Sequence, residues 1–409
     1  MVRLSREWIM RYPLLDWHGN KGNRSGDDAA SSRYTECRLA PISEDGLLAN
    51  LKKDNVDFQM NYSEDEEEPV TLPALFPNLL CNPNKGIGEA IASDWTCHNL
   101  TDVGNLILEY LKNGNLDFSN MAPDYPTGGT IINKNELINI YTTGKGKVKI
   151  RGKYRIEEQK GTKLLVFYEI PYSVVIEDLI DDLKISLNMG NLPGVIDIRE
   201  DSNTKEDRVV FEIENSVDPD HLAKIIYSIS DLEKTLSVNQ VALDTNLNPK
   251  LMNWQECIDI YVAHNIDVIT REAKFDLKKI EDRLEIVNGL LKALEDIDNI
   301  IALIKGSESS SAAKEALKVK YGFSEPQAKA IVDMKLGRLA GLERVEIENE
   351  QKELKSEQDK LNTLLSSEAN LKAELSTRLE SFINKFGDER KTEVINLEVS
   401  NDISESVLP

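Results

Sequence analysis

The feature that most constrains the fold is a run of apolar residues at helical spacing that begins near residue 277. They recur at steps of three and four residues, at Leu277, Ile280, Leu284, Val287, Leu291, Leu294, Ile297, Ile301 and Ile304. This near-heptad seam is typical of a helix that packs along a second helix. The spacing predicts one helix from 270 to 304, roughly 50 Å long at a rise of about 1.5 Å per residue.

A second seam follows a polar break at 305–311 and a compact segment at 312–343. Its apolar positions are Ile347, Leu354, Leu361, Leu364, Leu371, Leu375, Phe382 and Phe386. Within the compact segment, Ser324 is placed to cap a helix that has Glu325 and Pro326 in its first turn. Two long amphipathic helices that flank a small helical unit predict an antiparallel coiled coil with a globular tip.

The chain before the first seam combines two kinds of pattern. Residues 1–130 are punctuated by glycine and proline, which predicts a mixed, loop-rich domain. Between 130 and 245, β-branched residues alternate with polar ones in KVKIRGKYRIEE and KLLVFYEI, whereas VIEDLIDDLKISL and PDHLAKIIYSI have helical spacing. Together with the two seams, these patterns predict an α+β fold class with several domains.

Charge is distributed unevenly along the chain. The net charge of −22 argues at first against a nucleic-acid partner, because phosphate binding needs lysine and arginine. However, acidic residues gather at 63–68 and in the C-terminal third. Basic residues alternate along one stretch, at Lys145, Lys147, Lys149, Arg151, Lys153 and Arg155. On a strand they would share one face, which is either a phosphate-binding strip or an ordinary solvated surface.

Several classes of protein are excluded by what the sequence lacks. No run of about eighteen apolar residues exists and the N-terminus has no apolar signal-peptide core, which predicts a cytoplasmic protein. The four cysteines are far apart and fit a reduced interior better than disulfides or a zinc site. There is no Walker A, GxGxxG, GxSxG or HExxH motif, so no metal site is predicted in this chain.

The most informative segment is DWHGNKGNRSGDDAASSRYTECRLA, residues 16–40. It resembles the active-tyrosine segment of the A subunits of DNA gyrase and bacterial topoisomerase IV. The match consists of Asp16, the glycine-rich loop, and RYTE followed by Arg38-Leu39. The resemblance continues in order through VDFQMNYSEDEEEPVTLPALFPNLL, APDYPTGGTI, TGKGKVKIRGK, EIPY, VIDIREDSN and EPQAKAIVDMKLGRL, and so covers essentially the whole chain.

The resemblance implies the domain order of the A subunits of type IIA topoisomerases. The implied domains are a partial winged-helix cleavage domain (1–130), a tower-like α/β domain (131–250), a first coiled-coil arm (251–311), a helical exit-gate dimer contact (312–343), a returning coiled-coil arm (344–391) and a polar tail (392–409). By this resemblance, the helical tip joins two copies of the chain.

The resemblance makes Tyr34 the nucleophile that attacks the DNA backbone. Tyrosine is a weak nucleophile near neutral pH, since its reference pKa is about 10, and the attack needs positive charge around the phosphate. Arg33 is the expected source of that charge, because a guanidinium binds phosphate oxygens bidentately and stays ionised. Taken alone, the same residues would describe a half-buried aromatic ring beside a surface arginine.

The resemblance also implies the residues that hold DNA. Ile87 occupies the position of the isoleucine that the family wedges between base pairs, and apolar wedges are known to kink DNA. Its loop departs from the family's glycine- and serine-rich loop, and Ile87 could also be a core residue. Further expected DNA contacts are Lys85, Arg38, Lys145, Lys147 and Arg151.

The family pattern is incomplete in this chain. The upstream helices with the family's histidines are missing, and so is the C-terminal propeller, which favours relaxation or decatenation over supercoiling. Mg²⁺ and ATP are expected on a B-type partner, and double-stranded DNA and a second copy of the chain are the other expected partners. The alternative is a non-catalytic, DNA-binding scaffold that is inactive for lack of the N-terminal segment.

Overall fold

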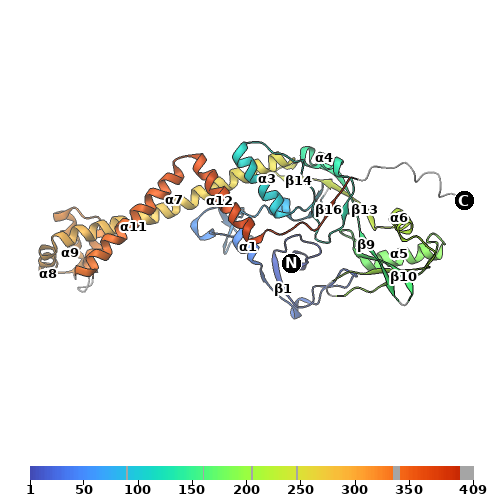
Figure 1. Ribbon diagram of the computed structural model, residues 1–409. Coiled ribbons are helices and arrows are strands. Elements are labelled where there is room, and N and C mark those ends of the chain that lie inside the picture. The colour runs from blue at the N-terminus through green and yellow to red at the C-terminus, as the bar shows by residue number, and fades with distance from the viewer. Residues whose placement is uncertain (89–90, 160, 204–205, 246, 335–340, 397–409) are drawn as a thin grey trace. The chain divides into compact units, whose positions relative to one another are not determined.

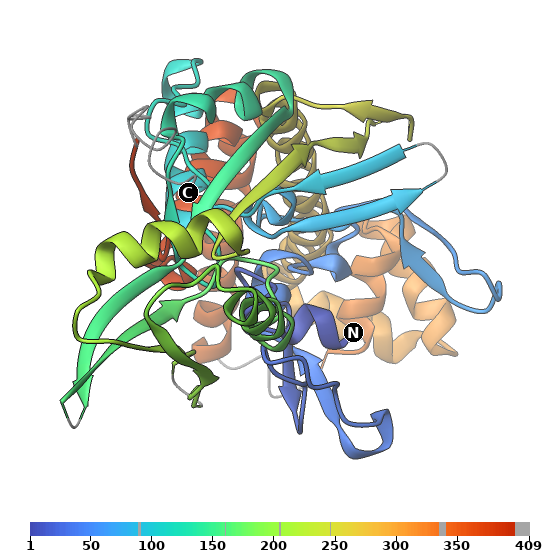
Figure 2. The same ribbon diagram turned by 90° about the vertical axis from the view of Figure 1, so that its right-hand side faces the viewer.

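The computed structural model describes residues 1–88, 91–159, 161–203, 206–245, 247–334 and 341–396, and Figures 1 and 2 show its elements. The chain forms two compact units. The first contains Met1–Ala49, Ala74–Ala263 and Ser376–Pro409, and the second contains Asn50–Pro73 and His264–Leu375. Helices and sheets are both present, which confirms the predicted α+β fold class. None of the helices in the described ranges is long and apolar enough to cross a membrane.

A six-stranded sheet organises the first unit. Its strands lie in the order β16 (Glu393–Val394), β7 (Thr130–Ile131), β8 (Lys145–Arg151), β13 (Glu233–Asn239), β6 (Ile91–Trp95) and β5 (Asn84–Gly88). β16 is parallel to β7, and the other neighbours are antiparallel. The longest register is that of β8 and β13, which runs from Glu233 opposite Arg151 to Asn239 opposite Lys145.

Helix α3 (Leu100–Asn113) of this unit shows how the sequence sets the ends of an element. The Asn99 side chain accepts hydrogen bonds from the amides of Thr101 and Asp102 and so caps the first turn. Gly114 ends the helix in a left-handed conformation that glycine adopts without steric cost. The other short helices of the unit are η1 (Val2–Ser5), η2 (Ser32–Tyr34), α1 (Pro41–Gly46), α2 (Asn78–Cys81), η4 (Lys134–Glu136) and α4 (Ile138–Thr143).

A four-stranded antiparallel sheet lies in the same unit. Its order is β11 (Val195–Glu200), β12 (Val209–Ile213), β10 (Thr162–Glu169) and β9 (Lys153–Gln159). Two helices, α5 (Ile176–Asn188) and α6 (Pro219–Ile229), share one apolar core with these strands, and this core includes Leu179, Ile226, Phe167 and Phe211. The strands and helices expected between 130 and 245 are therefore present.

The basic stretch at 145–155 is not one continuous strip, contrary to the prediction. Gly152 divides it between β8 of the six-stranded sheet and β9 of the four-stranded sheet. A Cβ atom at Gly152 would lie 2.6 Å from the carbonyl oxygen of Glu169, so only glycine fits where the chain changes sheets. Arg155 on β9 is paired with Glu157 and Glu206, which removes it from the basic face of β8.

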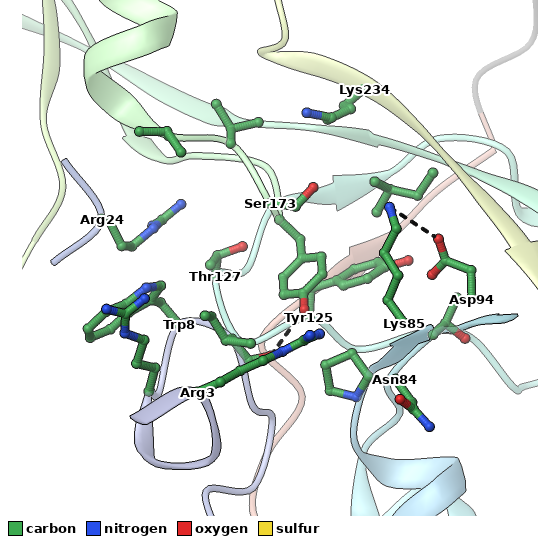
Figure 3. A pocket seen from close by; sticks show the side chains of 18 of the residues that line it. Arg3, Trp8, Arg24, Asn84, Lys85, Asp94, Tyr125, Thr127, Ser173 and Lys234 are labelled. Atoms are coloured by element: carbon green, nitrogen blue, oxygen red, sulfur yellow. Dashed lines mark hydrogen bonds and ion pairs between the residues drawn. The ribbon is translucent and has the colours of Figure 1, made fainter. Parts of the chain in front are cut away.

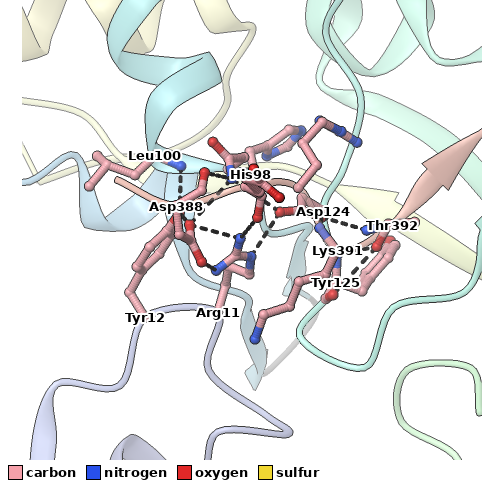
Figure 4. A network of polar contacts seen from close by, with 12 residues as sticks. Arg11, Tyr12, His98, Leu100, Asp124, Tyr125, Asp388, Lys391 and Thr392 are labelled. Carbon is pink, nitrogen blue, oxygen red and sulfur yellow. Dashed lines mark hydrogen bonds and ion pairs between the residues drawn. The ribbon is translucent and has the colours of Figure 1, made fainter. Parts of the chain in front are cut away.

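An ionic network of the buried Arg11 and Asp124 with the partly exposed Asp388 joins distant parts of the first unit (Figure 4). Arg11 donates hydrogen bonds from Nε to Asp124 at 2.8 Å and from Nη1 to Asp388 at 2.7 Å. The other oxygen of Asp124 accepts hydrogen bonds from the amides of Lys391 and Thr392. Buried charges are stable only when they are fully paired, so this network fixes the chain before β16 against the N-terminal segment.

Two further strand pairs complete the first unit. One consists of β1 (Leu15–His18) and β2 (Glu36–Leu39), and the other of β14 (Val241–Leu243) and β15 (Pro249–Leu251). Both pairs are antiparallel. The first pair frames the segment that carries Tyr34.

The second unit is mainly helical. Its elements are η3 (Leu51–Lys53), β3 (Phe58–Met60), β4 (Glu67–Pro69), most of α7 (Trp254–Glu295), α8 (Ile297–Gly306), α9 (Ser310–Tyr321), α10 (Glu325–Val332), α11 (Gly341–Leu365) and the start of α12 (Glu368–Phe386). Helices α7 and α11 run side by side (Figure 1), and Arg283 of α7 donates to Glu350 of α11 at 2.6 Å.

The first seam differs from the prediction in its limits and in its last turns. The helix runs from Trp254 to Glu295 rather than from 270 to 304, and a break at Asp296 separates it from α8. Leu284 and Val287 are buried as predicted. Beyond them the buried positions are Leu290, Ala293 and Ile300, one residue before the predicted Leu291, Leu294 and Ile301.

The buried positions shift because this part of the chain packs against two short helices, α9 and α10. Leu290, Ala293 and Ile300 pack in one core with Leu317 of α9 and with Ala328 and Ile331 of α10, and not along a single helix. A straight helix also drifts from a strict heptad repeat. The predicted cap at Ser324 is confirmed, because its side chain and that of Gln327 form a reciprocal capping box.

Candidate functional site

The loop between β1 and β2 is shaped by its glycines and by one asparagine. Gly19 and Gly22 have φ angles of 104° and 82°, a region that favours glycine. A Cβ atom at Gly22 would lie 2.4 Å from the carbonyl oxygen of Asp27. The Asn23 side chain accepts hydrogen bonds from the amides of Gly26 and Asp27 at 3.1 and 3.0 Å, so the loop folds back on itself.

The middle of this loop is anchored at Arg24 to the four-stranded sheet and its helix. Arg24 forms an ion pair with Asp207 and donates to the carbonyl oxygen of Ile170 at 3.0 Å. The carbonyl oxygen of Arg24 accepts from the amide of Ile176 at the start of α5. Burial lowers the pKa of Arg24 and raises the pKa of Asp207, and each charge opposes the shift of the other. The loop is thus held at a defined place within the first unit.

Tyr34 lies at the end of this loop, in the single turn η2. Its side chain is 69 % exposed, so the reading of this residue as a half-buried aromatic is wrong. The guanidinium of Arg33 lies 4.9 Å from the centre of the Tyr34 ring, at cation–π distance. The structure therefore brings together an accessible phenol and a permanent positive charge.

Arg38 lies on β2, opposite Asp16 on β1. Its Nε atom is 3.6 Å from a carboxylate oxygen of Asp16, and the two side chains are 81 % and 57 % exposed. A long, solvated pair of this kind is weak. Arg38 is therefore available to an anion that approaches the strand pair.

Ile87 lies near the end of β5, in the hairpin that β5 forms with β6. It is 84 % exposed, so the alternative reading of Ile87 as a core residue is wrong. Lys85 on the same strand faces Asp94 of β6 with a separation of 3.7 Å. Burial raises the pKa of Asp94, and the charge of Lys85 opposes that shift.

The lysines of β8 share one face, as the alternation predicted. Lys145 and Lys147 are exposed, whereas Val148 and Ile150 on the opposite face are buried. Among the described residues, no carboxylate lies within ion-pair distance of either lysine. Arg151 differs, because it is paired with Glu233 and stacks over the ring of Tyr227. Only the first part of the strip is a free basic surface.

His98 is a buried structural residue. Its Nδ1 atom lies 3.0 Å from the carbonyl oxygen of Leu80, and its Nε2 atom lies 3.1 Å from the hydroxyl of Tyr141. Burial lowers its pKa to about 3, so the ring is neutral near pH 7. Among the residues that the structure describes, no three His, Cys, Asp or Glu side chains are grouped to hold a metal ion.

A cavity of about 760 Å³ in the first unit was not predicted from the sequence. In Figure 3 the side chains of Arg3, Arg24, Lys85 and Lys234 surround Tyr125. These residues come from separate stretches of the chain, and each stretch contributes only a few side chains. APDYPTGGTI and EIPY, which contain lining residues, were noted only as parts of the resemblance, and no local motif marks the cavity.

A family model and individual relatives both relate this chain to the A subunits of DNA gyrase and topoisomerase IV. The model of a family described as the A subunits of DNA gyrase/topoisomerase IV matches residues 1–380. The DNA gyrase A subunit of Aminobacterium colombiense is 39 % identical over 404 residues, which cover 97 % of this chain and 49 % of the relative. The DNA topoisomerase 4 A subunit of Streptococcus pyogenes is 36 % identical and is covered to the same 49 %, with 96 % of this chain aligned. The chain thus spans about half the length of these relatives.

Proposed function

The chain belongs to the family of DNA gyrase and topoisomerase IV A subunits, and on that premise we propose that it is the DNA breakage-reunion subunit of an ATP-dependent type II topoisomerase. The proposal includes the winged-helix, tower and coiled-coil domains that the sequence resemblance implies. The observation that carries the proposal is the exposed Tyr34 phenol beside Arg33 on an anchored loop.

In the proposed reaction, the Tyr34 oxygen attacks a backbone phosphorus atom of DNA. The phenol gives up its proton as its oxygen bonds to phosphorus, the bond from phosphorus to one deoxyribose oxygen breaks, and this departing oxygen takes up a proton to become a hydroxyl. Because one ester replaces another, the reverse reaction can reseal the strand without an energy source at that step. Arg33 is proposed to stabilise the negative charge that builds up on the phosphate oxygens.

The same proposal assigns roles in DNA binding to exposed residues of the first unit. Ile87 is proposed to wedge between base pairs, a role that its exposure permits. Lys145 and Lys147 on the free face of β8 are proposed to contact phosphates. Arg38 and Lys85 have long ion pairs that a phosphate could replace. Arg151 is the weakest candidate of the set, because Glu233 already pairs with it.

The proposed cofactors are bound by another chain. By the family resemblance, a B-type partner would hold Mg²⁺ and ATP. When bound there, Mg²⁺ would supply positive charge near the reacting phosphate. The part of the site that this chain provides is the nucleophile, the adjacent arginine and the DNA-holding surface.

We further propose that the segment 312–343 makes a contact between two copies of the chain. Its helices α9 and α10 are described, whereas residues 335–340 lie outside the described part of the structure. Val319 on α9 is 86 % exposed, so its side chain is accessible to a second copy of the chain. Leu317, two residues away, is buried in the local core.

A point substitution tests the dimer better than deletion of 312–343, because deletion would also expose Leu290 and Ala293 of α7. Val319→Glu should convert a dimer to a monomer while the helix content stays unchanged. The measurement is the mass by light scattering during size-exclusion chromatography. The matched control is Lys320→Glu at the neighbouring exposed position. If the Val319→Glu protein were still a dimer, Val319 would not be part of the interface.

The cleavage proposal is tested by transfer of ³²P from labelled duplex DNA to the protein in the presence of Mg²⁺ and a B-type partner. Wild type should acquire the label, and Tyr34→Phe should lose it completely, because the substitution removes only the attacking oxygen. Unchanged circular dichroism would show that the variant is folded. If wild type takes no label even after the family's N-terminal segment is added in trans, a non-catalytic, DNA-binding scaffold becomes the better description.

A further inference from the structure

Two adjacent side chains of the loop between β1 and β2 contact one end of the four-stranded sheet. Arg24 forms an ion pair with Asp207, which lies two residues before β12. The hydroxyl of Ser25 donates a hydrogen bond at 2.5 Å to Glu200, the last residue of β11. The side chains of Arg24 and Asp207 are only 12 % and 23 % exposed. Charges shielded from water attract each other more strongly than charges on the surface, so this pair can hold the loop.

The backbone of the same two loop residues caps helix α5. The carbonyl oxygen of Arg24 accepts a hydrogen bond from the amide of Ile176 at 3.1 Å, and that of Ser25 accepts from the amide of Glu177 at 3.3 Å. These amides lie in the first turn of α5, and its N-cap residue, Val175, makes no side-chain cap. The first amides of a helix have no partner within the helix. The loop therefore supplies what a capping side chain usually provides.

The segment that receives the Arg24 guanidinium has a fixed backbone. Its Nη2 atom donates to the carbonyl oxygen of Ile170 at 3.0 Å. Three residues further on, Ser173 has a φ angle of 62°, a left-handed conformation that is uncommon for residues other than glycine. Such a conformation persists only where the surrounding structure determines it. The chain between Ile170 and α5 is thus a preformed seat for the loop.

The loop connects this seat closely to Tyr34. The amide of Ala30 donates to the carbonyl oxygen of Asn20 at 3.1 Å, which closes the loop on itself. At the start of the loop, a Cβ atom on Gly19 would lie 3.1 Å from the carbonyl oxygen of Tyr34, so the two backbones are in close contact. Closely packed segments transmit a displacement. A shift of the loop at Arg24 would therefore also shift Tyr34.

We propose that Asp207 and Glu200 are positioning residues for the attack by Tyr34. They hold the loop on the four-stranded sheet, and the loop holds the phenol at the place where it meets the phosphate. Neither carboxylate binds DNA itself, because its negative charge repels phosphate. This inference rests on the proposed cleavage function and adds to it two residues that lie far from Tyr34 in the sequence.

The first test compares wild type with Asp207→Asn in the full chain with a B-type partner. The substitution keeps the size of the side chain and removes the charge that pairs with Arg24. The single-turnover rate of cleavage of labelled duplex DNA should fall by about ten- to hundredfold, since misplacement of a reacting group by about 1 Å can cost about 10²-fold. The affinity for the same DNA, measured by fluorescence anisotropy, should be unchanged or higher, because a negative charge is lost.

A double variant separates positioning from a DNA contact of Arg24. Arg24→Met combined with Asp207→Leu replaces the ion pair by an apolar contact, an exchange that often preserves stability. It should cleave much faster than Asp207→Asn. The matched control is Asp197→Asn on β11, which breaks an exposed pair with Arg199 and should cleave like wild type. Unchanged cleavage in Asp207→Asn, a parallel loss of DNA affinity, or a double variant as slow as Asp207→Asn would overturn the proposal.

Hydrogen exchange of the chain without DNA distinguishes failure of this inference from failure of the proposed function. In Asp207→Asn the hydrogen-bonded amides of Ala30 and Tyr34 should exchange faster than in wild type, because the loop opens more often. The amides of β8 should exchange at the wild-type rate. If wild type cleaves no DNA, the proposed function fails, and faster exchange would still support anchoring of the loop by Asp207. Equal exchange at Ala30 and Tyr34 in both proteins would overturn that anchoring.

Discussion

The two Arg-Tyr dipeptides of the sequence, Arg11-Tyr12 and Arg33-Tyr34, have nearly the same local geometry and opposite surroundings. The guanidinium of Arg11 lies 4.7 Å from the centre of the Tyr12 ring, and that of Arg33 lies 4.9 Å from the centre of the Tyr34 ring. Tyr12 is 6 % exposed, whereas Tyr34 is 69 % exposed. The dipeptide alone therefore does not define a role.

The hydrogen bonds of the two phenols explain the difference. The hydroxyl of Tyr12 donates to Asp388 at 2.7 Å and accepts from the amide of Leu100 at 2.7 Å. Burial raises the pKa of Tyr12 far above its ordinary value, so this phenol stays protonated and structural. No described residue binds the Tyr34 hydroxyl in this way. Only the exposed pair can meet a phosphate.

The largest expected effect is on stability at the buried pair. Arg11→Met should lower the free energy of unfolding by about 3–5 kcal/mol, because it leaves Asp124 and Asp388 without their buried counter-charge. Urea unfolding monitored by tryptophan fluorescence measures this change. A loss below about 1 kcal/mol would mean that the network in Figure 4 contributes little to the stability of the fold.

The same substitution at the exposed pair is the matched comparison. Arg33→Met should change the free energy of unfolding by less than about 0.5 kcal/mol, as is usual for a surface substitution. If the proposed function is right, it should lower the rate of DNA cleavage by about 10²–10³-fold, the usual cost of losing one group that stabilises transition-state charge. Equal stability losses at Arg11 and Arg33 would contradict the comparison.

The sequence singles out one of the two pairs and gives no sign of the role of the other. Tyr34 lies in a local segment, residues 16–40, whose glycines and arginines are readable in order. The partners of Arg11 are Asp124 and Asp388, which are 113 and 377 residues away in the chain. Neither carboxylate has a local pattern that marks it as buried, so only the folded chain shows the network.

The same distinction between local and distant determinants explains the other outcomes. The cap at Ser324 depends on residues within one turn and is confirmed. The last turns of the first seam depend on contacts with α9 and α10, and their buried positions are shifted by one residue. The basic strip is divided at Gly152 because of a close approach to Glu169. The cavity around Tyr125 likewise requires segments that are remote in the sequence.

A smaller effect is expected from acid, and it should act on the buried region. His98 lies two residues before Leu100, whose amide binds Tyr12, and its pKa is lowered to about 3. The unfolded chain binds a proton at His98 near pH 6.5, whereas the folded chain does not. Stability from this residue is therefore complete above pH 6.5 and falls by about 1.4 kcal/mol per pH unit as the pH decreases toward 3.

Urea unfolding at pH 7, 6 and 5 measures this dependence above the range where carboxylates titrate. Below pH 6, the free energy of unfolding of the wild type should fall with the slope expected for uptake of about one proton on unfolding. His98→Gln should lose this part of the pH dependence. His221→Gln is the control, because His221 is exposed, and it should keep the wild-type slope. An unchanged slope in His98→Gln would show that the ring is charged in the folded protein.

The smallest expected effect concerns Arg38. Like Arg11 it pairs with a carboxylate, but it is exposed to solvent. The separation of 3.6 Å from Asp16 is longer than that of Arg11 from Asp388, at 2.7 Å, and both Arg38 and Asp16 lie in solvent. Arg38→Gln should therefore change the free energy of unfolding by less than about 0.5 kcal/mol. If Arg38 contacts a phosphate, the variant should bind duplex DNA a few-fold less tightly.

The salt dependence of DNA binding separates a phosphate contact at Arg38 from a general effect of charge. The affinity of Arg38→Gln should depend less steeply on salt, by a slope of about one in a plot of log K against log salt concentration. Binding isotherms between about 50 and 200 mM salt measure this slope. Asp16→Asn, which breaks the same ion pair but keeps Arg38, is the control. If both variants show the same salt slope as wild type, Arg38 does not contact the DNA backbone, and the exposed region contributes to binding through its other cations alone.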